Sequence, residues 1–233
     1  MIILLALIPP FLVALWFYKK DKNPEPLRHT IKAILSGVLV CLPVLLVVGF
    51  FIEPWIGNTF HSNALISGFV SAFLLAAIPE EFFKFVFLKR YIFSEECDEP
   101  YDFVFYGAMV SVGFAAIENV FFVLDGGLIV AIGRAFTAVP MHAVCGAMMG
   151  YGLLQSIKFA SGKNFFTWEI IKGTLFIPIV FHGLYDWPIF VAYHEGISDI
   201  LVIISCVFWL GVMFFFLKIF IKMMKGIQQK SQG

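Results

Sequence analysis

The sequence predicts an all-α fold, a polytopic membrane bundle of about seven transmembrane helices forming one integral membrane domain over residues 1–233. Hydrophobic residues make up 61% of the chain, charged residues only 14%, and the mean hydropathy is +0.92, well above the range of soluble globular proteins. Apolar runs long enough to cross ~30 Å of hydrocarbon recur along the chain. Basic residues flank alternate loops between these runs.

The first apolar run, 2–18, is expected to be a retained helix and not a signal peptide. It has no basic start and ends in Trp-Phe-Tyr, where a cleavage site needs small residues. Polar loops or tight turns, such as Asp125-Gly126-Gly127, separate the later runs. The expected spans are 2–18, 31–52, 64–88, 103–124, 128–157, 170–193 and 197–221.

The distribution of lysine and arginine predicts the orientation of the bundle. Of the 16 basic residues, all but Lys84 and Arg134 flank the first, third and fifth loops (the last at 158–169) or lie in the C-terminal tail. The second loop, which leads to His61, has none, and neither do the fourth and sixth. Because cytoplasmic loops hold the excess of basic residues, the pattern predicts an N-out, C-in topology.

Composition also excludes several classes of function. No basic patch with interleaved aromatic residues is present, so nucleic acid is not an expected partner. The four cysteines show no CxxC spacing for metal or redox chemistry. The lipid bilayer is therefore the expected surroundings, in a cell membrane, and the oligomeric state stays open.

Three charged residues, Glu80, Glu81 and Lys84, interrupt the apolar run 64–88. Each charge near a bilayer centre costs roughly 2.5–3.5 kcal/mol on insertion scales, so three together require a pairing or a function. At helical spacing the Lys84 ammonium can neutralise at least one of the two carboxylates. Adjacent carboxylates in a low dielectric tend to share a proton, whereas a nearby ammonium favours ionisation of one of them. This combination suits a general base.

Other predicted spans carry further ionisable residues at membrane depth. Glu118, beside Asn119, is open to three interpretations: a catalytic partner, a substrate-binding group, or the counter-charge of Arg134 or Lys84. His142 suits either catalysis or a structural hydrogen bond between helices. All of these side chains are expected to point into the bundle.

His182 and Asp186 form a second pair at helical spacing. An aspartate beside an imidazole orients the ring or stabilises its cation, which serves both hydrolases and ordinary buried pairs. Prolines precede three of the candidate regions, at Pro79, Pro140 and Pro178. Each removes a backbone donor, so the sequence predicts bent helices beside the candidate residues. Gly146 and Gly150 predict a close helix contact.

Four motifs in order resemble the PrsW family of intramembrane proteases, within the wider group of CAAX prenyl endopeptidases and bacteriocin-processing Abi proteins. The resemblance covers most of the chain and includes the loop with Pro24-Glu25-Pro26. It implies a glutamate-type peptidase without a bound metal or other cofactor, in a bacterial cytoplasmic membrane, that cuts a membrane-anchored protein such as an anti-sigma factor. The motifs are Pro79-Glu80-Glu81-x-x-Lys84, Gly113-Phe114-Ala115-x-x-Glu118-Asn119, His142-x-x-x-Gly146 and Phe181-His182-x-x-x-Asp186.

The resemblance also implies roles for these residues. Glu80 would activate water with help from His142, while Glu81 and Lys84 tune and position it. His182 would stabilise the oxyanion of the tetrahedral intermediate, a task for donors aimed at developing charge. Lys84 stands one position closer than the arginine of the prenyl endopeptidases, which argues against prenylated substrates. The implied catalytic residues are Glu80, Glu81, His142 and His182, with support from Lys84, Glu118, Asn119 and Asp186.

Two other functions use the same residues. Histidines and carboxylates also form zinc sites, so a zinc-dependent membrane metalloprotease is one alternative, although no HExxH motif occurs. Chains of acidic residues and histidines in a helical bundle also serve proton-coupled transport, which is the second alternative.

Overall fold

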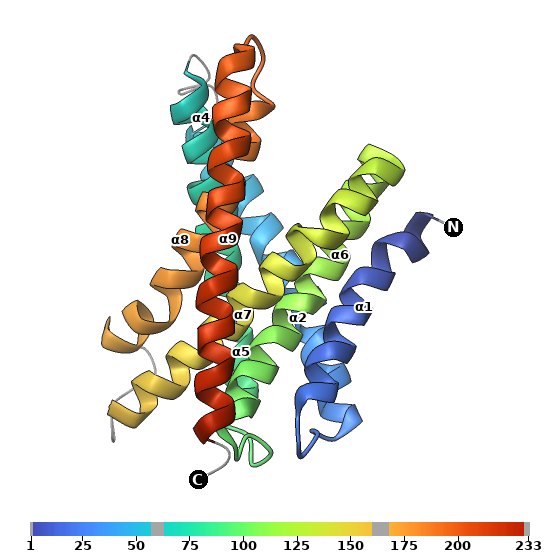
Figure 1. Cartoon of the computed structure of the whole chain (residues 1–233), viewed down its shortest axis with the longest axis vertical. Coiled ribbons are helices and arrows are strands. Elements are labelled where there is room, and N and C mark those ends of the chain that lie inside the picture. The colour runs from blue at the N-terminus through green and yellow to red at the C-terminus, as the bar shows by residue number, and fades with distance from the viewer. Residues whose placement is uncertain (1, 57–62, 160–167, 231–233) are drawn as a thin grey trace.

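The computed structural model describes residues 2–56, 63–159 and 168–230, and within them every regular element is helical (Figure 1). The predicted all-α class is therefore confirmed. Two segments, labelled η, are π-helical. The elements are α1 Ile2–Lys20, α2 Leu27–Val47, η1 Val48–Ile52, α3 Glu53–Ile56, α4 Ala64–Val70, η3 Ser71–Ala77, α5 Ile78–Ile92, α6 Pro100–Phe136, α7 Ala138–Phe159, α8 Trp168–Ala192 and α9 Asp199–Lys230.

Six helical stretches in the described ranges are long and apolar enough to span a membrane, where the sequence predicts seven. The difference lies in the 57-residue stretch Pro100–Ser156, which contains two of the predicted spans. Within it, Gly127 has φ 70° and ψ −154°, a left-handed conformation that glycine adopts without strain. The helix is therefore broken at Gly127, where the chain reverses sharply, at the tight turn that the sequence predicts between the spans 103–124 and 128–157. The other stretches are Ile2–Lys20, Leu27–Ile52, Ala64–Ile92, Gly173–Ala192 and Asp199–Ile227.

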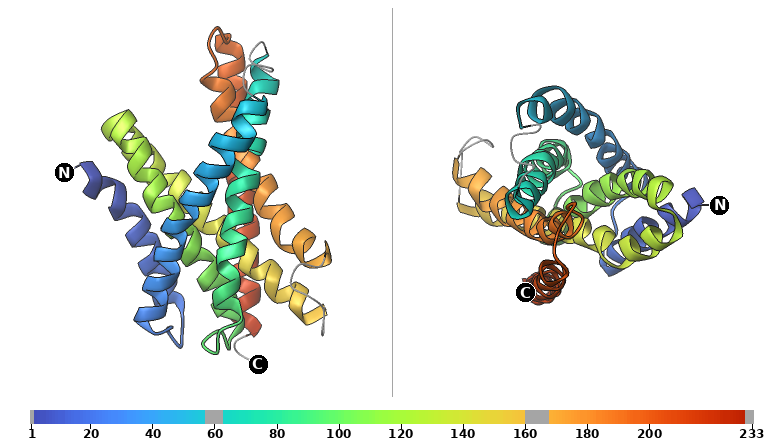
Figure 2. Two further views of the ribbon diagram at one scale, coloured as in Figure 1. Left: turned by 180° about the vertical axis from the view of Figure 1, so that it is seen from behind. Right: turned by 90° about the horizontal axis from the view of Figure 1, so that it is seen from above.

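Backbone contacts between glycines hold the two arms of this hairpin together. A Cβ on Gly146 would lie 2.1 Å from the carbonyl oxygen of Gly107, and one on Gly150 would lie 1.8 Å from that of Phe103. Later residues on α7 thus meet earlier residues on α6, so the arms are antiparallel. The predicted close contact at Gly146 and Gly150 is confirmed. Because α6 also packs against α1 and α2, the hairpin joins the N-terminal helices to the rest of the bundle (Figure 2).

Prolines change the helix geometry at two of the three predicted positions. Both π-helical segments end two residues before a proline, η1 before Pro54 and η3 before Pro79. The wider π turn accommodates the missing backbone donor and the bulk of the ring. The helix is also interrupted three residues before Pro140, at Thr137 (φ −125°, ψ −75°). α8, in contrast, continues through Pro178.

The turn 21–26 and the loop 93–99 lie at the same end of the bundle, the lower end in Figure 1. The side-chain amide of Asn23 donates a hydrogen bond to Glu99 across them. Burial, reinforced by the nearby charge of Glu99, raises the pKa of Asp21 to about 6. The first and third loops, which the flanking basic residues predict to lie on one side of the membrane, therefore lie at the same end of the bundle. The connector to His61 and most of the predicted loop 158–169 fall outside the described residues.

Large apolar side chains cover the outer faces of the bundle. On α1, Phe11 is 63% exposed, and the other outward side chains of α1, α2 and α9 are mainly leucine, isoleucine and phenylalanine. An apolar surface of this extent does not suit water, and it matches the hydrocarbon of a bilayer. Representative exposed residues are Leu4, Leu35, Leu42, Leu45, Ile203, Leu210 and Phe214.

Candidate active site

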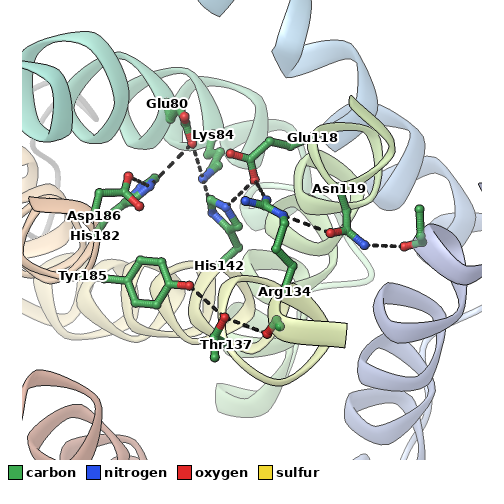
Figure 3. A network of polar contacts seen from close by, with 12 residues as sticks. Glu80, Lys84, Glu118, Asn119, Arg134, Thr137, His142, His182, Tyr185 and Asp186 are labelled. Atoms are coloured by element: carbon green, nitrogen blue, oxygen red, sulfur yellow. Dashed lines mark hydrogen bonds and ion pairs between the residues drawn. The ribbon is translucent and has the colours of Figure 1, made fainter. Parts of the chain in front are cut away.

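The four predicted catalytic side chains meet in one buried cluster. Glu80 and Glu81 lie in the first turn of α5, directly after the π-helical segment, and His142 and His182 reach them from α7 and α8. One potential ligand atom from each of the four lies within 4.8 Å of the other three. The two imidazole rings stand edge to face, with centroids 4.9 Å apart. Figure 3 shows three of these residues with their neighbours.

Lys84 lies at the centre of this cluster. Its Nζ is 2.7 Å from Glu81 Oε1, 3.4 Å from Glu80 Oε2 and 3.0 Å from His142 Nδ1. The ammonium also stands 4.2 Å from the centre of the Phe114 ring, at the distance of a cation–π contact. Helical spacing predicts that Lys84 neutralises at least one of the two carboxylates, and in the structure it contacts both.

His182 is held between carboxylates on both sides. Its Nδ1 lies 2.9 Å from Glu81 Oε1 and its Nε2 lies 3.1 Å from Asp186 Oδ2. Glu80 Oε2 is farther from Nε2, at 3.8 Å. Since an ionised carboxylate only accepts hydrogen bonds, these surroundings suit a ring that donates from both nitrogens. The predicted pairing of His182 with Asp186 is confirmed.

A second chain of polar contacts runs from His142 towards α1. His142 Nε2 lies 2.8 Å from Glu118 Oε2, which is also 2.5 Å from Arg134 Nη2. Arg134 Nε donates to Asn119 Oδ1 at 3.0 Å, and Asn119 Nδ2 donates to the carbonyl of Ala6 at 2.6 Å. Of the three interpretations of Glu118, the counter-charge of Arg134 is the one observed. Asn119 lies outside the central cluster and ties α6 to α1.

Sequence reasoning missed several residues beside the cluster. Tyr185, next to Asp186, donates from its hydroxyl to Thr137 Oγ1 at 2.9 Å (Figure 3). Both line a cavity of about 590 Å³ between α8 and α9, whose wall also includes Trp209. In the described part of the chain, the buried Trp209 Nε1 has no hydrogen-bond partner. Aromatic residues are common in membrane helices, so no signal in the sequence distinguished Tyr185 or Trp209.

The donor types of the cluster suit zinc, but their arrangement does not. Two imidazoles and two carboxylates form an ordinary zinc ligand set. Here, however, His142 Nδ1 lies 3.0 Å from the Lys84 ammonium, and its Nε2 lies against Glu118. Both nitrogens of His182 face carboxylates. As arranged, the residues do not fit a divalent cation, because Lys84 lies among the donors and the ring nitrogens are already hydrogen-bonded.

Comparison with known proteins assigns the family. Residues 25–218 match the family model described as PrsW family intramembrane metalloprotease. Curated relatives, each named Protease PrsW, include that of Geobacillus kaustophilus, 35% identical over 175 residues that cover 74% of this chain and 72% of that protein. The Oceanobacillus iheyensis protein is 34% identical over 79% of this chain and 81% of its own. The Bacillus subtilis protein is 29% identical over 91% of this chain and 92% of its own.

No solved structure matches this chain. The family resemblance expected from the four motifs is confirmed by the family model and by the relatives. With candidate membrane-spanning helices throughout its length and bacterial relatives, the chain is a multi-pass membrane protein. It belongs to the PrsW family of intramembrane proteases.

Proposed function

We propose that this chain hydrolyses a peptide bond of a membrane-anchored protein by means of a water molecule activated by Glu80, without a catalytic metal ion. The proposal rests on the different burial and contacts of Glu80 and Glu81. Glu81 is fully buried and contacts both Lys84 and His182 at 2.9 Å or less. Glu80 keeps 7% of its surface exposed, and its shortest ion-pair contact is 3.4 Å. Glu80 is thus the carboxylate with an accessible oxygen, which a general base requires.

Glu81 and Lys84 form the closest ion pair of the site. The ammonium at 2.7 Å keeps Glu81 as the fixed counter-ion, and the longer contact to Glu80 leaves that carboxylate free to receive a proton. His142, between Lys84 and Glu118, orients the ammonium and does not itself contact the water. This assignment alters the role of His142 from direct help in activating water to positioning.

Glu80 carries out two proton transfers during cleavage. Glu80 takes a proton from water while the water oxygen forms a bond to the scissile carbonyl carbon. The N–H at His182 Nε2, which lies 3.1 Å from Asp186 Oδ2 and 3.8 Å from Glu80 Oε2, shifts its hydrogen bond from Asp186 to the oxyanion that develops. Glu80 returns its proton to the amide nitrogen as the carbon–nitrogen bond breaks, which releases an amine and a carboxylic acid.

We propose that the substrate segment enters the cavity between α8 and α9. An intramembrane protease acts on a membrane protein, and the motif resemblance favours an anti-sigma-factor-like substrate. The cavity adjoins Asp186 through Tyr185, and Trp209 lines it. The Trp209 N–H, buried and without a partner among the described residues, would donate to a backbone carbonyl of an unwound substrate segment after the indole turns towards the cavity. We also propose the N-out, C-in orientation, for which the distribution of basic loop residues is the support.

A zinc-dependent reaction is the second candidate. The description of the family model and the close approach of four potential ligands favour it. Such a metal would be held by Glu80, Glu81, His142 and His182 after Lys84 moved away. Proton-coupled transport has no comparable observation in its favour.

The deciding experiment is cleavage of a membrane-anchored reporter by the purified protein in detergent, before and after exhaustive chelation. We expect Glu80→Gln to lower kcat by about 10²-fold or more, the usual contribution of a general base. Glu195→Gln, on an exposed turn, is the matched control and should keep full activity. Cleavage that stops on chelation and returns with zinc would contradict the metal-independent mechanism. Full activity of Glu80→Gln would contradict the assignment of the base.

A further inference from the structure

A second cluster of carboxylates lies at the end of the bundle where the turn 21–26 meets the start of α6. It consists of Asp21, Glu99 and Asp102, and one carboxylate oxygen from each lies within 4.8 Å of the other two. Asp21 and Asp102 are buried. None of the three contacts the candidate catalytic residues, so the mechanism proposed above does not use them.

Hydrogen bonds within the cluster account for some of its oxygens. Asp21 Oδ1 accepts from the backbone N–H of Asn23 at 3.1 Å, and the side-chain amide of Asn23 donates to Glu99 Oε1. Glu99 and Asp102 form a reciprocal capping box at the start of α6, in which the Glu99 N–H donates to Asp102 Oδ2 at 2.6 Å. These bonds set the geometry of the loop but bring no positive charge to it.

One oxygen of the cluster has no partner. Asp21 is only 8% exposed, and its Oδ2 is buried without a hydrogen bond in the described part of the chain. A buried polar atom left in this state is costly, and a buried carboxylate oxygen especially so. The orphaned oxygen is therefore an observation separate from the clustering of acids, and it indicates a ligand.

In the described ranges, no ion pair joins a positive side chain to any of the three carboxylates. The nearby His29 is paired with Glu96 instead, at 3.2 Å. A fourth acid, Glu25, is also buried close by and accepts a hydrogen bond from the Tyr106 hydroxyl at 2.7 Å. Buried charges normally have a partner, so a cation is the missing component.

We propose that Asp21, Glu99 and Asp102 bind a hard divalent cation, Mg²⁺ or Ca²⁺. All of the available donors are carboxylate oxygens, which these ions prefer, whereas zinc and copper favour nitrogen or sulfur ligands. Because the ligands come from two segments far apart in the sequence, the ion links the α1–α2 turn to the start of α6. Its role is to stabilise this end of the bundle, and it takes no part in peptide hydrolysis.

The neighbouring aromatic residues connect this end to the helix of the catalytic glutamates. The ring of Tyr106, which holds Glu25, stacks on Tyr91 of α5 with centroids 5.3 Å apart. The hydroxyl of Tyr91 in turn lies 2.6 Å from Ser36 Oγ on α2. Loss of the ion is therefore expected to loosen the packing of α2, α5 and α6 at this end.

Terbium luminescence provides a direct test, because Tb³⁺ occupies oxygen sites of this kind and a nearby tyrosine sensitises its emission. Tyr101 immediately precedes Asp102 in the chain and supplies the sensitiser. We expect saturable luminescence on addition of Tb³⁺ to the full-length protein in detergent, with separate titrations showing whether Mg²⁺ or Ca²⁺ displaces it. Asp21→Asn should weaken Tb³⁺ binding by about tenfold or more, because loss of even a supporting group at a metal site costs that much.

Two further variants locate the bound ion. Glu95→Gln, an exposed acid in the same loop, is the matched control and should bind as the unmodified chain does. Glu80→Gln should also leave the signal unchanged, because the luminescent site is not the catalytic cluster. The proposal is overturned if Asp21→Asn binds Tb³⁺ normally, if Glu80→Gln abolishes the signal, or if neither Mg²⁺ nor Ca²⁺ displaces the probe at millimolar concentration.

A thermal measurement covers the case in which Asp21→Asn fails to fold. The midpoint of unfolding of the unmodified chain should rise when Mg²⁺ or Ca²⁺ is added after chelation, because a ligand that binds only the folded state stabilises it. Cleavage activity below the melting temperature should be unaffected by the same additions. An unchanged midpoint with both ions would overturn the proposal.

Discussion

Replacement of Lys84 by methionine tests whether the central cluster is held together by charge. Methionine keeps most of the length and volume of lysine but removes the ammonium that contacts Glu80, Glu81 and His142. Of the described residues, His182 alone would then remain in ion-pair contact with the two buried carboxylates. Removal of one partner from a buried ion pair costs about 3–5 kcal/mol, because the remaining charge stays buried and uncompensated.

The loss of stability caused by Lys84→Met should lie within this range of about 3–5 kcal/mol. The lysine side chain is 1% exposed, so water cannot replace its charge. Its shortest contact, 2.7 Å to Glu81 Oε1, is a charge-assisted hydrogen bond, and the 3.4 Å contact to Glu80 adds a weaker one. We therefore expect the free energy of unfolding to fall by about 3–5 kcal/mol, measured by equilibrium unfolding in mixed micelles.

Two companion variants make the measurement specific. Lys222→Met removes an exposed lysine of α9 and should have little effect. The double variant Lys84→Met with Glu81→Gln removes both members of the shortest pair and should be more stable than Lys84→Met alone, since the uncompensated charge is gone. The ionic account of the cluster would be refuted if Lys84→Met cost less than about 1 kcal/mol, the value of an exposed pair. A double variant no more stable than Lys84→Met would refute it equally.

Three further predictions concern residues around the site. Glu118→Gln should lower kcat by about 10²-fold with little change in KM, because it removes the carboxylate that orients His142; equal changes in both constants would contradict this positioning role. Gly150→Ala should lower the free energy of unfolding by about 1–3 kcal/mol or more, since the added Cβ would lie 1.8 Å from the Phe103 carbonyl oxygen. A Cβ added at Gly211 has no neighbour within 4 Å, so Gly211→Ala is the control in the same unfolding assay. Trp209→Phe should raise KM for the reporter and leave kcat nearly unchanged; an unaltered KM would exclude the indole N–H from substrate binding.

Most of the candidate site was predictable because charged groups are rare and costly at membrane depth. Glu80, Glu81, Lys84, His142 and His182 stood out against apolar runs, and the structure brings all five together. Tyr185 and Trp209 carried no such signal, because aromatic residues pack in membrane helices for many reasons. Asn119, which the motif pattern grouped with the site, accepts a hydrogen bond from Arg134 and donates one to the Ala6 carbonyl of α1.

The sequence by itself determined the membrane class, the helical architecture and the family motifs, since these follow from composition, apolar length and spacing along one helix. The tertiary structure alone decided that Lys84 contacts His142 as well as both glutamates and that Glu118 pairs with Arg134. Helical spacing defines only the neighbours three and four residues away. The rotation and crossing of separate helices depend on packing between them, which no single segment specifies.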